Sequence, residues 1–464
     1  MRKKLVALAV LFVFFEISAV NFDFSESYDR FLKGHSVGAS ISPVYEGDST
    51  LLELDFYGSF YFDMLRFGFL LPVRFILYNN NNIETTAGVF PKEDWDDARD
   101  FVAIITFFQY GFKGDLFYFY FGEQENRYAG NGTILGGYFN NIKLRFPKRG
   151  VSLEINSDYA GFDFFMDDVS FPNVMGGRAY LKPVSFFSKE SYGNNLEIGF
   201  SYFSDVYSPY KISTLYDSGV PKRDFERYSD HVFGVDLNFR YLATSLYHGE
   251  VYSDINKILD GGTGIHLGLE HKFILSSKND MEILSKWEYR AMQSNYIPSY
   301  FNTFYDIERE YYRNGQTKSR FVNDSSRKNL DWTHGYYLDL VFHFTGVFAV
   351  GGSFEHNRIY KSDVKLGKFD NYQLNLLANV LLFNNKFGLD FVMTFQELGE
   401  KGKRLSSYPF YSVSAYYKLY KYLTIGAFVS SKWYLDYRGA GTTSEFSYKG
   451  ITVVSGGAYG SFSF

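Results

Sequence analysis

Four basic residues stand out because they alternate with apolar neighbours. Lys143 and Arg145 are interleaved with the apolar residues of 142–146, and Arg178 and Lys182 are interleaved with apolar positions of 179–181. Successive side chains of a β-strand point to opposite faces, and a cation on the lipid face of a membrane strand costs about 2–4 kcal/mol at the midplane. We therefore predict that these four cations line a water-filled interior.

Acidic residues occupy comparable positions elsewhere in the chain. The candidates for the same interior are Glu53, Asp55, Asp163, Asp339 and Asp390. A basic wall that faces an acidic wall creates a transverse field, which orients polar solutes and biases the passage of ions, here towards anions near the basic wall. The alternative is that these charges only pair with one another and hydrate the interior. The sequence leaves both readings open.

No residue set indicates catalysis, a metal or a cofactor. The His-x-Ser-Asn-Gly string of outer-membrane phospholipases is absent, and Asp230-His231, which matches part of the outer-membrane protease pattern, is a dipeptide that arises by chance at this length. His266 and His271 have an odd spacing in the sequence, so a strand would point them to opposite faces. The chain has no Cys, which excludes disulfides and thiolate ligands. We expect no enzyme, no metal and no cofactor.

The elements that would position these charges are β-strands. Apolar and polar residues alternate with period two in several segments, namely 141–146, 151–156, 233–240, 265–273 and 387–396. Many segments extend to about ten residues, the length of a tilted strand that spans a bilayer. The 51 Phe and 41 Tyr residues exceed what a soluble core holds easily, whereas a membrane barrel places aromatics at its lipid face and interfaces. A large soluble sandwich, which also alternates, is the alternative.

Short turns alternate with long loops along most of the chain. We place short turns near 63, 113–114, 240–241, 277–279, 346, 384–385 and 420–421, and long loops near 78–100, 123–137, 205–228, 295–332, 398–406 and 434–447. The pattern gives about 21 strands, and termini on one side of the membrane demand an even number. We predict an all-β fold with a single transmembrane antiparallel β-barrel of about 20 strands, within a range of 18–22.

The N-terminus has the form of a signal peptide. Arg2, Lys3 and Lys4 precede a short apolar stretch that ends near a small-residue cleavage site at 17–19. We divide the chain into a signal peptide, 1–19, and an outer-membrane barrel, 20–464. Cleavage removes three cations and Glu16, which changes the net charge from −5 to −7. This acidity argues against nucleic acid as a partner.

The C-terminus carries a more specific resemblance. Residues 451–464 form a final strand with Phe462 and Phe464 at alternate positions. It resembles the last strand of bacterial outer-membrane β-barrels of porin-like type, although Gly456 and Gly460 depart from the pattern. The resemblance implies an outer-membrane location, contact with outer-membrane lipid and handling by the barrel-assembly machinery, with Phe462 and Phe464 as the assembly signal.

The leading functional prediction is a porin-like channel for passive diffusion of small hydrophilic solutes, narrowed by an inward-folded loop at 78–100 or 295–332. One alternative is a substrate-selective transporter, for example for hydrophobic molecules, suggested by Leu70, Ile76 and Phe165. Another is a structural or adhesive surface barrel. The sequence leaves a homo-oligomer open.

The terminal aromatic generates a first prediction. Deletion of Phe464 should reduce the amount of barrel assembled in the outer membrane, because this residue acts as a recognition signal rather than as a core contact. Immunoblots of outer-membrane fractions measure the assembled amount, and refolding of the purified deletion variant in detergent is the control. Equal outer-membrane levels of the deletion variant and the wild type would contradict the prediction.

Overall fold

The fold is described from a computed structural model. The structure describes residues 35–462 except 47–48, 80–82, 84, 87, 96–97, 144–147, 188–194, 218–219, 277–280, 313–315, 328–329, 345, 361–366, 385, 397, 399–408, 421–422 and 437–446. The predicted signal peptide, Arg145 and Phe464 therefore lie outside the described residues.

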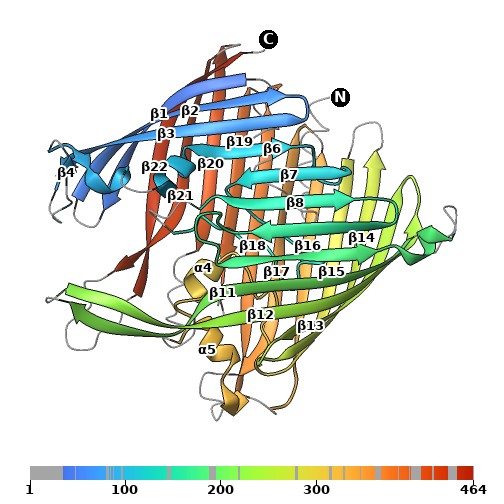
Figure 1. Cartoon of the computed structure of the whole chain (residues 1–464). Helices are drawn as coiled ribbons and strands as arrows, with labels where there is room; N and C mark the ends of the chain where they lie inside the picture. Colours follow the sequence, from blue (N-terminus) through green and yellow to red (C-terminus); the bar gives the residue numbers. More distant parts are fainter. Residues whose placement is uncertain are drawn as a thin grey trace.

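Twenty strands form one antiparallel sheet that closes on itself (Figure 1). They are β1 (His35–Glu46), β2 (Ser49–Phe62), β3 (Leu65–Tyr78), β6 (Ile105–Tyr110), β7 (Phe117–Gly122), β8 (Gly150–Asn156), β9 (Ala160–Met166), β10 (Val174–Leu181), β11 (Leu196–Asp217), β12 (Val220–Ala243), β13 (Tyr247–Ile258), β14 (Thr263–Ser276), β15 (Met281–Met292), β16 (Thr333–Phe344), β17 (Phe348–Tyr360), β18 (Lys368–Leu382), β19 (Phe387–Phe395), β20 (Phe410–Tyr420), β21 (Leu423–Asp436) and β22 (Ser447–Phe462). Each strand pairs with the next one in the sheet, and β22 returns to pair with β1. The predicted all-β barrel of about 20 strands is confirmed.

Smaller elements lie in the connections. The strands β4 (Thr85–Thr86) and β5 (Phe90–Pro91) form a separate hairpin, and the helices are η1 (Lys92–Asp94), α3 (Ala98–Ala103), η2 (Pro183–Phe186), α4 (Tyr305–Glu308), α5 (Lys318–Val322) and η4 (Ser325–Arg327). No helix within the described ranges is long and apolar enough to cross a membrane.

The two faces of the sheet differ in polarity, and β13 illustrates this. Val251 and Ile255 are 39% and 53% exposed on the outer face, whereas Asp254 and Asn256 are only 3% and 1% exposed on the inner face. Neighbouring strands repeat this pattern with exposed Val235 on β12 and other apolar residues on β14. An apolar exterior around a polar interior suits a sheet that is surrounded by lipid.

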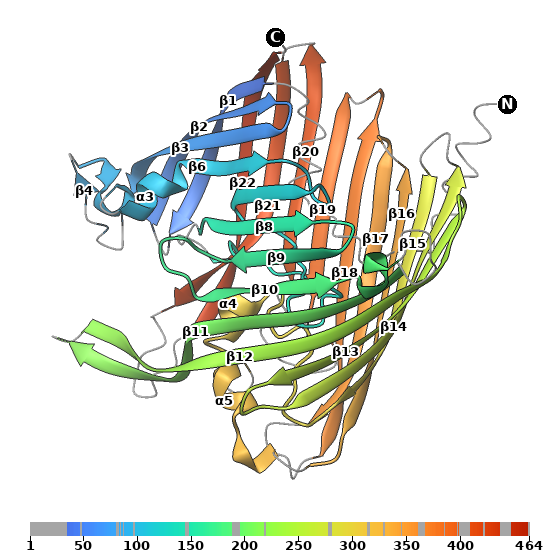
Figure 2. The same cartoon turned by 45° about the vertical axis from the view of Figure 1, so that its right-hand side comes forward.

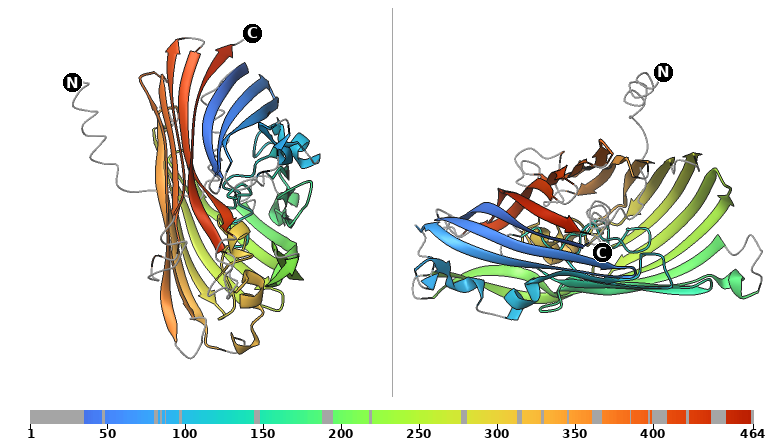
Figure 3. Two further views of the ribbon diagram at one scale, coloured as in Figure 1. Left: turned by 90° about the vertical axis from the view of Figure 1, so that its left-hand side faces the viewer. Right: turned by 90° about the horizontal axis from the view of Figure 1, so that it is seen from above.

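The walls of the barrel are steeply tilted relative to one another. Strands β6–β10 run from left to right in the picture, while β16–β20 run nearly from top to bottom (Figures 1 and 2). Seen from above, the barrel is flattened (Figure 3). Where the sheet curves, aromatic rings pack directly over glycines of the adjacent strand. At Gly268, for example, an added Cβ atom would lie only 2.0 Å from Cζ of the buried Tyr252 ring. Glycine thus makes room for a ring on the concave face.

Two sequence predictions about local structure are wrong. Residues 205–228 were predicted as a long loop, but β11 and β12 continue through them as a paired hairpin with register shifts around Ser208 and Pro209. Residues 141–146 were predicted as a strand with Ile142 facing lipid. The described part of this segment belongs instead to the 123–149 connection, and Ile142 is completely buried inside the barrel.

The lipid-facing assignment can be tested at the middle of β14. Leu269 is 43% exposed on the outer face. Replacement Leu269→Arg should lower the free energy of unfolding in phospholipid vesicles by about 2–4 kcal/mol, the cost of a cation near the bilayer midplane. Leu269→Met, which keeps an apolar side chain, is the matched control. If urea titrations give the same unfolding free energy for both variants, residue 269 does not face lipid.

Candidate functional site

Two long connections fold into the barrel and determine its interior. We call residues 126–139, from the β7–β8 connection, the tongue, and residues 299–312, from the β15–β16 connection, the crossbar. The tongue is a hairpin-like loop in which the backbone amides of Arg127 and Tyr138 each donate to the carbonyl of the other, at 2.9 and 3.1 Å. Gly130 and Gly132 turn its tip with φ of +51° and +74°, values that glycine adopts without strain.

Polar contacts hold the tip of the tongue against the wall. The Thr133 hydroxyl donates to Asp254 at 2.5 Å, and the Asn131 amide donates to the same carboxylate at 2.7 Å. Lys286 on β15 donates to the Asn131 carbonyl at 2.8 Å. A Cβ at Gly130 would lie 2.9 Å from Cδ of Arg178, so the tip has little room for a larger residue. The tongue is therefore docked on β10–β15.

The crossbar spans the interior from one wall to the opposite wall. On one side, Tyr300 donates to Asp230 on β12 at 2.8 Å, and Tyr305 donates to Asp205 on β11 at 2.9 Å. On the other side, Phe304 packs against Trp433 on β21, with ring centroids 5.7 Å apart. In the order of pairing, β11 and β21 are half the ring apart. A continuous segment thus crosses the barrel.

Apolar side chains fill the space around both segments. The larger cluster joins the tongue, the crossbar and α5 to inward-facing residues of β9–β15. It contains Ile134, Leu135, Tyr138, Phe165, Val174, Phe203, Val232, Ile258, Met292, Tyr296, Ile297, Tyr300, Phe301, Tyr305, Phe321 and Val322. A second cluster, on the opposite wall, contains Phe139, Ile142, Phe304, Ile307, Phe410, Trp433 and Tyr448. Part of the barrel interior is therefore a packed core.

Buried ion pairs tie the crossbar to the tongue connection. The Lys148 ammonium lies 2.7 Å from Asp167 and 2.8 Å from Asp306 of α4. Burial would lower the pKa of Lys148, but the two carboxylates outweigh it and raise that pKa. Charges removed from water are stable only when they are paired and hydrogen-bonded. This triad therefore fixes the crossbar relative to the end of the tongue connection and the β9–β10 turn.

A second set of charges surrounds Glu310 at the end of the crossbar. Its carboxylate accepts from Lys143 at 2.9 Å and from Tyr448 at 2.6 Å, and it also pairs with Arg223 of the β11–β12 hairpin. Burial alone would raise the pKa of Glu310, but Lys143 and Arg223 outweigh that effect and lower the pKa. Glu310 thus stays ionised and links three connections.

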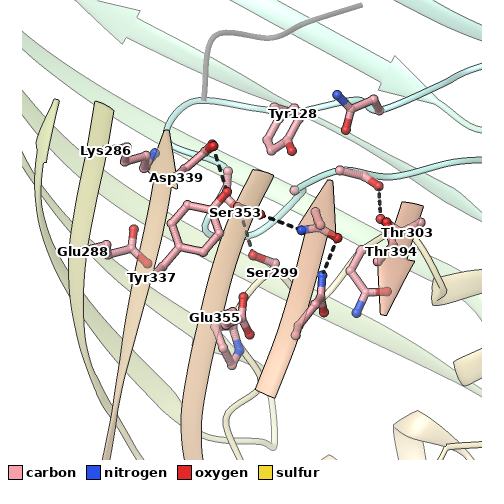
Figure 4. Close-up of a pocket in the computed structure, with 18 of the residues that line it drawn as sticks. Tyr128, Lys286, Glu288, Ser299, Thr303, Tyr337, Asp339, Ser353, Glu355 and Thr394 are labelled. Carbon is pink, nitrogen blue, oxygen red and sulfur yellow. Dashed lines mark hydrogen bonds between the residues drawn. The ribbon is translucent and has the colours of Figure 1, made fainter. Parts of the chain in front are cut away.

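Two cavities among the described residues lie beside the tongue, one on each side of it. The first has about 80 Å³ open to the centres of water molecules and lies between the tongue, the crossbar and β15–β19 (Figure 4). The second has about 520 Å³ of space for the centres of water molecules. It lies between the tongue and β8–β11, next to the Lys113-Gly114 turn. Tyr128 lines both cavities. The tongue therefore separates two polar spaces within one barrel.

The predicted basic wall is not formed by the described cations. Arg178 does lie in the interior, but it pairs with Asp236 and with Glu197, each at 2.6 Å. Lys143 also lies inside, on a loop rather than on the predicted strand, and it pairs with Glu310 at 2.9 Å. Lys182 directly follows β10 and places its ammonium 5.4 Å from the Tyr180 ring centroid. Arg145 lies outside the described residues.

The predicted acidic residues are distributed around the barrel. Asp163 lines the second cavity and lies across from Arg178 in the β9–β10 register, and Asp339 lines the first cavity. Glu53 and Asp55 lie on β2, where Arg74 is the register partner of Glu53, and Asp390 on β19 accepts from Ser414 at 3.3 Å. These residues do not form one wall. Phe462 ends β22 across from His35 of β1.

Sequence reasoning missed the residues that shape the cavities. Tyr128, Asn131 and Thr133 were assigned to an outer loop, and nothing in their local pattern indicates that the loop turns inward. One signal was available in 296–312, where several Tyr and Phe residues occur in a segment without strand periodicity. Such a cluster in a long loop favours burial over exposure.

Comparisons with known proteins give distant similarity only. No protein-family model matches the chain, and no curated protein matches it. Among solved structures, the chain is similar to OccAB4 of Acinetobacter baumannii at 9% identity, with 92% of this chain and 96% of that chain covered and a TM-score of 0.33. It is also similar to the outer membrane protein OpdK of Pseudomonas aeruginosa at 7% identity, 93% and 98% coverage and a TM-score of 0.35. The siderophore receptor PirA of Pseudomonas aeruginosa matches at 12% identity, 92% and 80% coverage and a TM-score of 0.35.

The arrangement of the strands identifies the class of the protein. A closed antiparallel sheet of 20 strands with an apolar outer face and a polar inner face defines a transmembrane β-barrel of the outer-membrane type. The similarities above assign the chain to no family.

The Lys148 triad generates a prediction. Lys148→Met should leave Asp167 and Asp306 buried without their cation, which costs about 3–5 kcal/mol. Amide hydrogen exchange of residues 299–309 should then accelerate about a hundredfold or more, while β14–β18 keep their protection. Lys272→Met is the matched control, because Lys272 is 39% exposed and its pair with Glu282 should contribute only about 0–1 kcal/mol. Unchanged exchange in the crossbar would mean that the triad does not hold it.

Proposed function

We propose that the protein is an outer-membrane channel through which small hydrophilic solutes diffuse, and that the tongue and the crossbar narrow it. The observation that carries the proposal is the polarity of the two cavities inside a barrel whose outer face is apolar. The first cavity is lined by amides, hydroxyls and carboxylates, among them Asn375, Thr394 and Asp339. Polar solutes exchange their hydration for such groups at little cost, whereas an apolar solute gains nothing from them.

The constriction is formed by parts of two connections. The crossbar belongs to the 295–332 loop, one of the two loops expected to narrow the channel. The other expected loop, 78–100, has its Asp94 paired with Arg74 on β3, and a different connection supplies the tongue. Because the crossbar is fixed by buried ion pairs and the tongue by hydrogen bonds to the wall, passage should follow the spaces beside them rather than require their removal.

A transporter for hydrophobic molecules is supported less well. Phe165, one of the residues that suggested it, packs edge-on against Tyr138 of the tongue, with centroids 5.4 Å apart. Its ring is part of the inner core and is only 4% exposed. Although Phe165 contributes to the lining of the second cavity, nearly all of its ring is covered, so it presents little aromatic surface to a solute.

The anion preference expected from the basic wall stays a prediction, and two features weigh against it. Arg178 and Lys143 are already neutralised by carboxylates. In addition, carboxylates lie directly across from each other on neighbouring strands, as Glu250 and Glu270 do on β13 and β14. Like charges placed in this way repel each other and favour a nearby cation.

Shortening the tongue tests the proposal. Because the backbones of Arg127 and Tyr138 already pair, residues 129–136 can be replaced by an Asn-Gly turn without separating the ends. We expect small unitary currents from the purified wild type in planar bilayers and severalfold larger ones from the shortened variant, since the two cavities would merge.

The control replaces Gly88 and Val89, between β4 and β5, by the same Asn-Gly turn and should leave the current unchanged. Absence of any unitary current from correctly folded wild type and shortened variant would refute the channel. Equal currents from both would place the constriction elsewhere.

A further inference from the structure

The first cavity has a wall of uncharged polar side chains. Ser353, Asn375 and Thr394 lie side by side on β17, β18 and β19, because each is the register partner of the next. The Asn375 side-chain amide donates to the Ser353 hydroxyl at 2.7 Å, and the Gln373 side chain donates to Oδ1 of Asn375 at 3.4 Å (Figure 4). These groups both donate and accept hydrogen bonds. They form a continuous strip across three strands.

The cations next to this strip are paired with carboxylates, and Asp339 lies across from Lys286 in the β15–β16 register and accepts from Tyr337. Lys286 is 2% exposed, and its ammonium contacts Glu270 at 2.9 Å and the Asn131 carbonyl at 2.8 Å. Arg290 pairs with Glu355 at 2.9 Å. A charged ligand would have to break a buried pair to gain a partner, which costs more than a surface contact returns. The cavity therefore favours an uncharged ligand.

The tongue supplies the opposite side of the cavity. Tyr128 extends from it towards Tyr337 and Asp339 on β16, and the backbone of Gly136 and Gly137 completes this side (Figure 4). Tyr337 donates to Asp339 at 3.1 Å. An aromatic ring opposite a strip of amides and hydroxyls suits a ligand with one C–H-rich face and hydroxyls around its edge.

The size of the cavity narrows the class further. One water requires about 10–15 Å³ of space open to its centre, so the 80 Å³ of this cavity accommodates about six waters. At about 30 Å³ of liquid volume each, six waters occupy roughly the volume of one pyranose ring. We infer that the cavity between the tongue and β15–β19 binds one uncharged polyhydroxylated ring, such as a monosaccharide, on its way through the channel. The inference rests on the proposed function and names its solute.

Calorimetry on the folded protein in detergent tests this inference independently of transport. Glucose is the probe, and lysine and glutamate are charged probes of similar size. We expect weak glucose binding and no binding of either amino acid. Asn375→Ala and Thr394→Val should each weaken glucose binding about fivefold to tenfold, the effect of one lost hydrogen bond.

Asn371→Ala is the matched control, since Asn371 lies on β18 on the same face as Asn375 but outside the cavity lining. It should bind glucose as the wild type does, and resistance to unfolding in cold detergent gels verifies that every variant is folded. Binding of lysine or glutamate in preference to glucose, or equal glucose affinity in all variants, overturns the inference. Conductance without glucose binding also overturns it while the channel proposal stands; glucose binding without conductance refutes the channel and retains the site.

Discussion

Closure of the backbone hydrogen-bond ring is the constraint on which the rest of this structure depends. In lipid, an unpaired backbone amide or carbonyl costs several kcal/mol, so a membrane sheet must have no free edge. The pairing of β22 with β1 over His35–Ile41 removes the last edge. Once the ring is closed, each inward side chain faces the same enclosed space, and the alternation of each strand decides what that space contains.

The enclosed space is too large for the wall side chains to fill, and two connections occupy part of it. Their apolar residues cannot face water at the barrel mouth without cost, so they pack on apolar positions such as Phe203 and Met292 at one end of the inner wall. Their charged residues then become buried as well, and each must find a partner. Lys318 shows the result: it is fully buried, pairs with Glu308 and lies about 5 Å from the Tyr300 and Tyr305 ring centroids.

The sequence predicts the strands of the wall well, because there the alternation of apolar and polar residues has one cause: one face meets lipid and the other meets the polar interior. Leu267 and Leu269 face outward, and His266 faces inward, as their positions require. The same period misleads at Ile142, where alternation arises from a loop that packs one side on an inner core rather than on lipid. The β11–β12 hairpin was missed for the opposite reason: Pro209 and the shifted register interrupt the alternation although pairing continues. The cavities could not be predicted, because they depend on where Tyr128 docks, and that contact joins residues far apart in the chain.

The way the interior is held together also decides where a solute can pass. Displacing the crossbar would separate Lys148 from Asp306 and expose an aromatic core, and the loss of even one such buried pair costs about 3–5 kcal/mol. The tip of the tongue is held mainly by hydrogen bonds of Asn131 and Thr133, which contribute about 1–3 kcal/mol each. Together these bonds are comparable to one buried ion pair, so the tongue and the crossbar are held with similar strength. Because Tyr128 lines both cavities, this side chain separates them, and the two segments act as fixed walls beside which a solute passes.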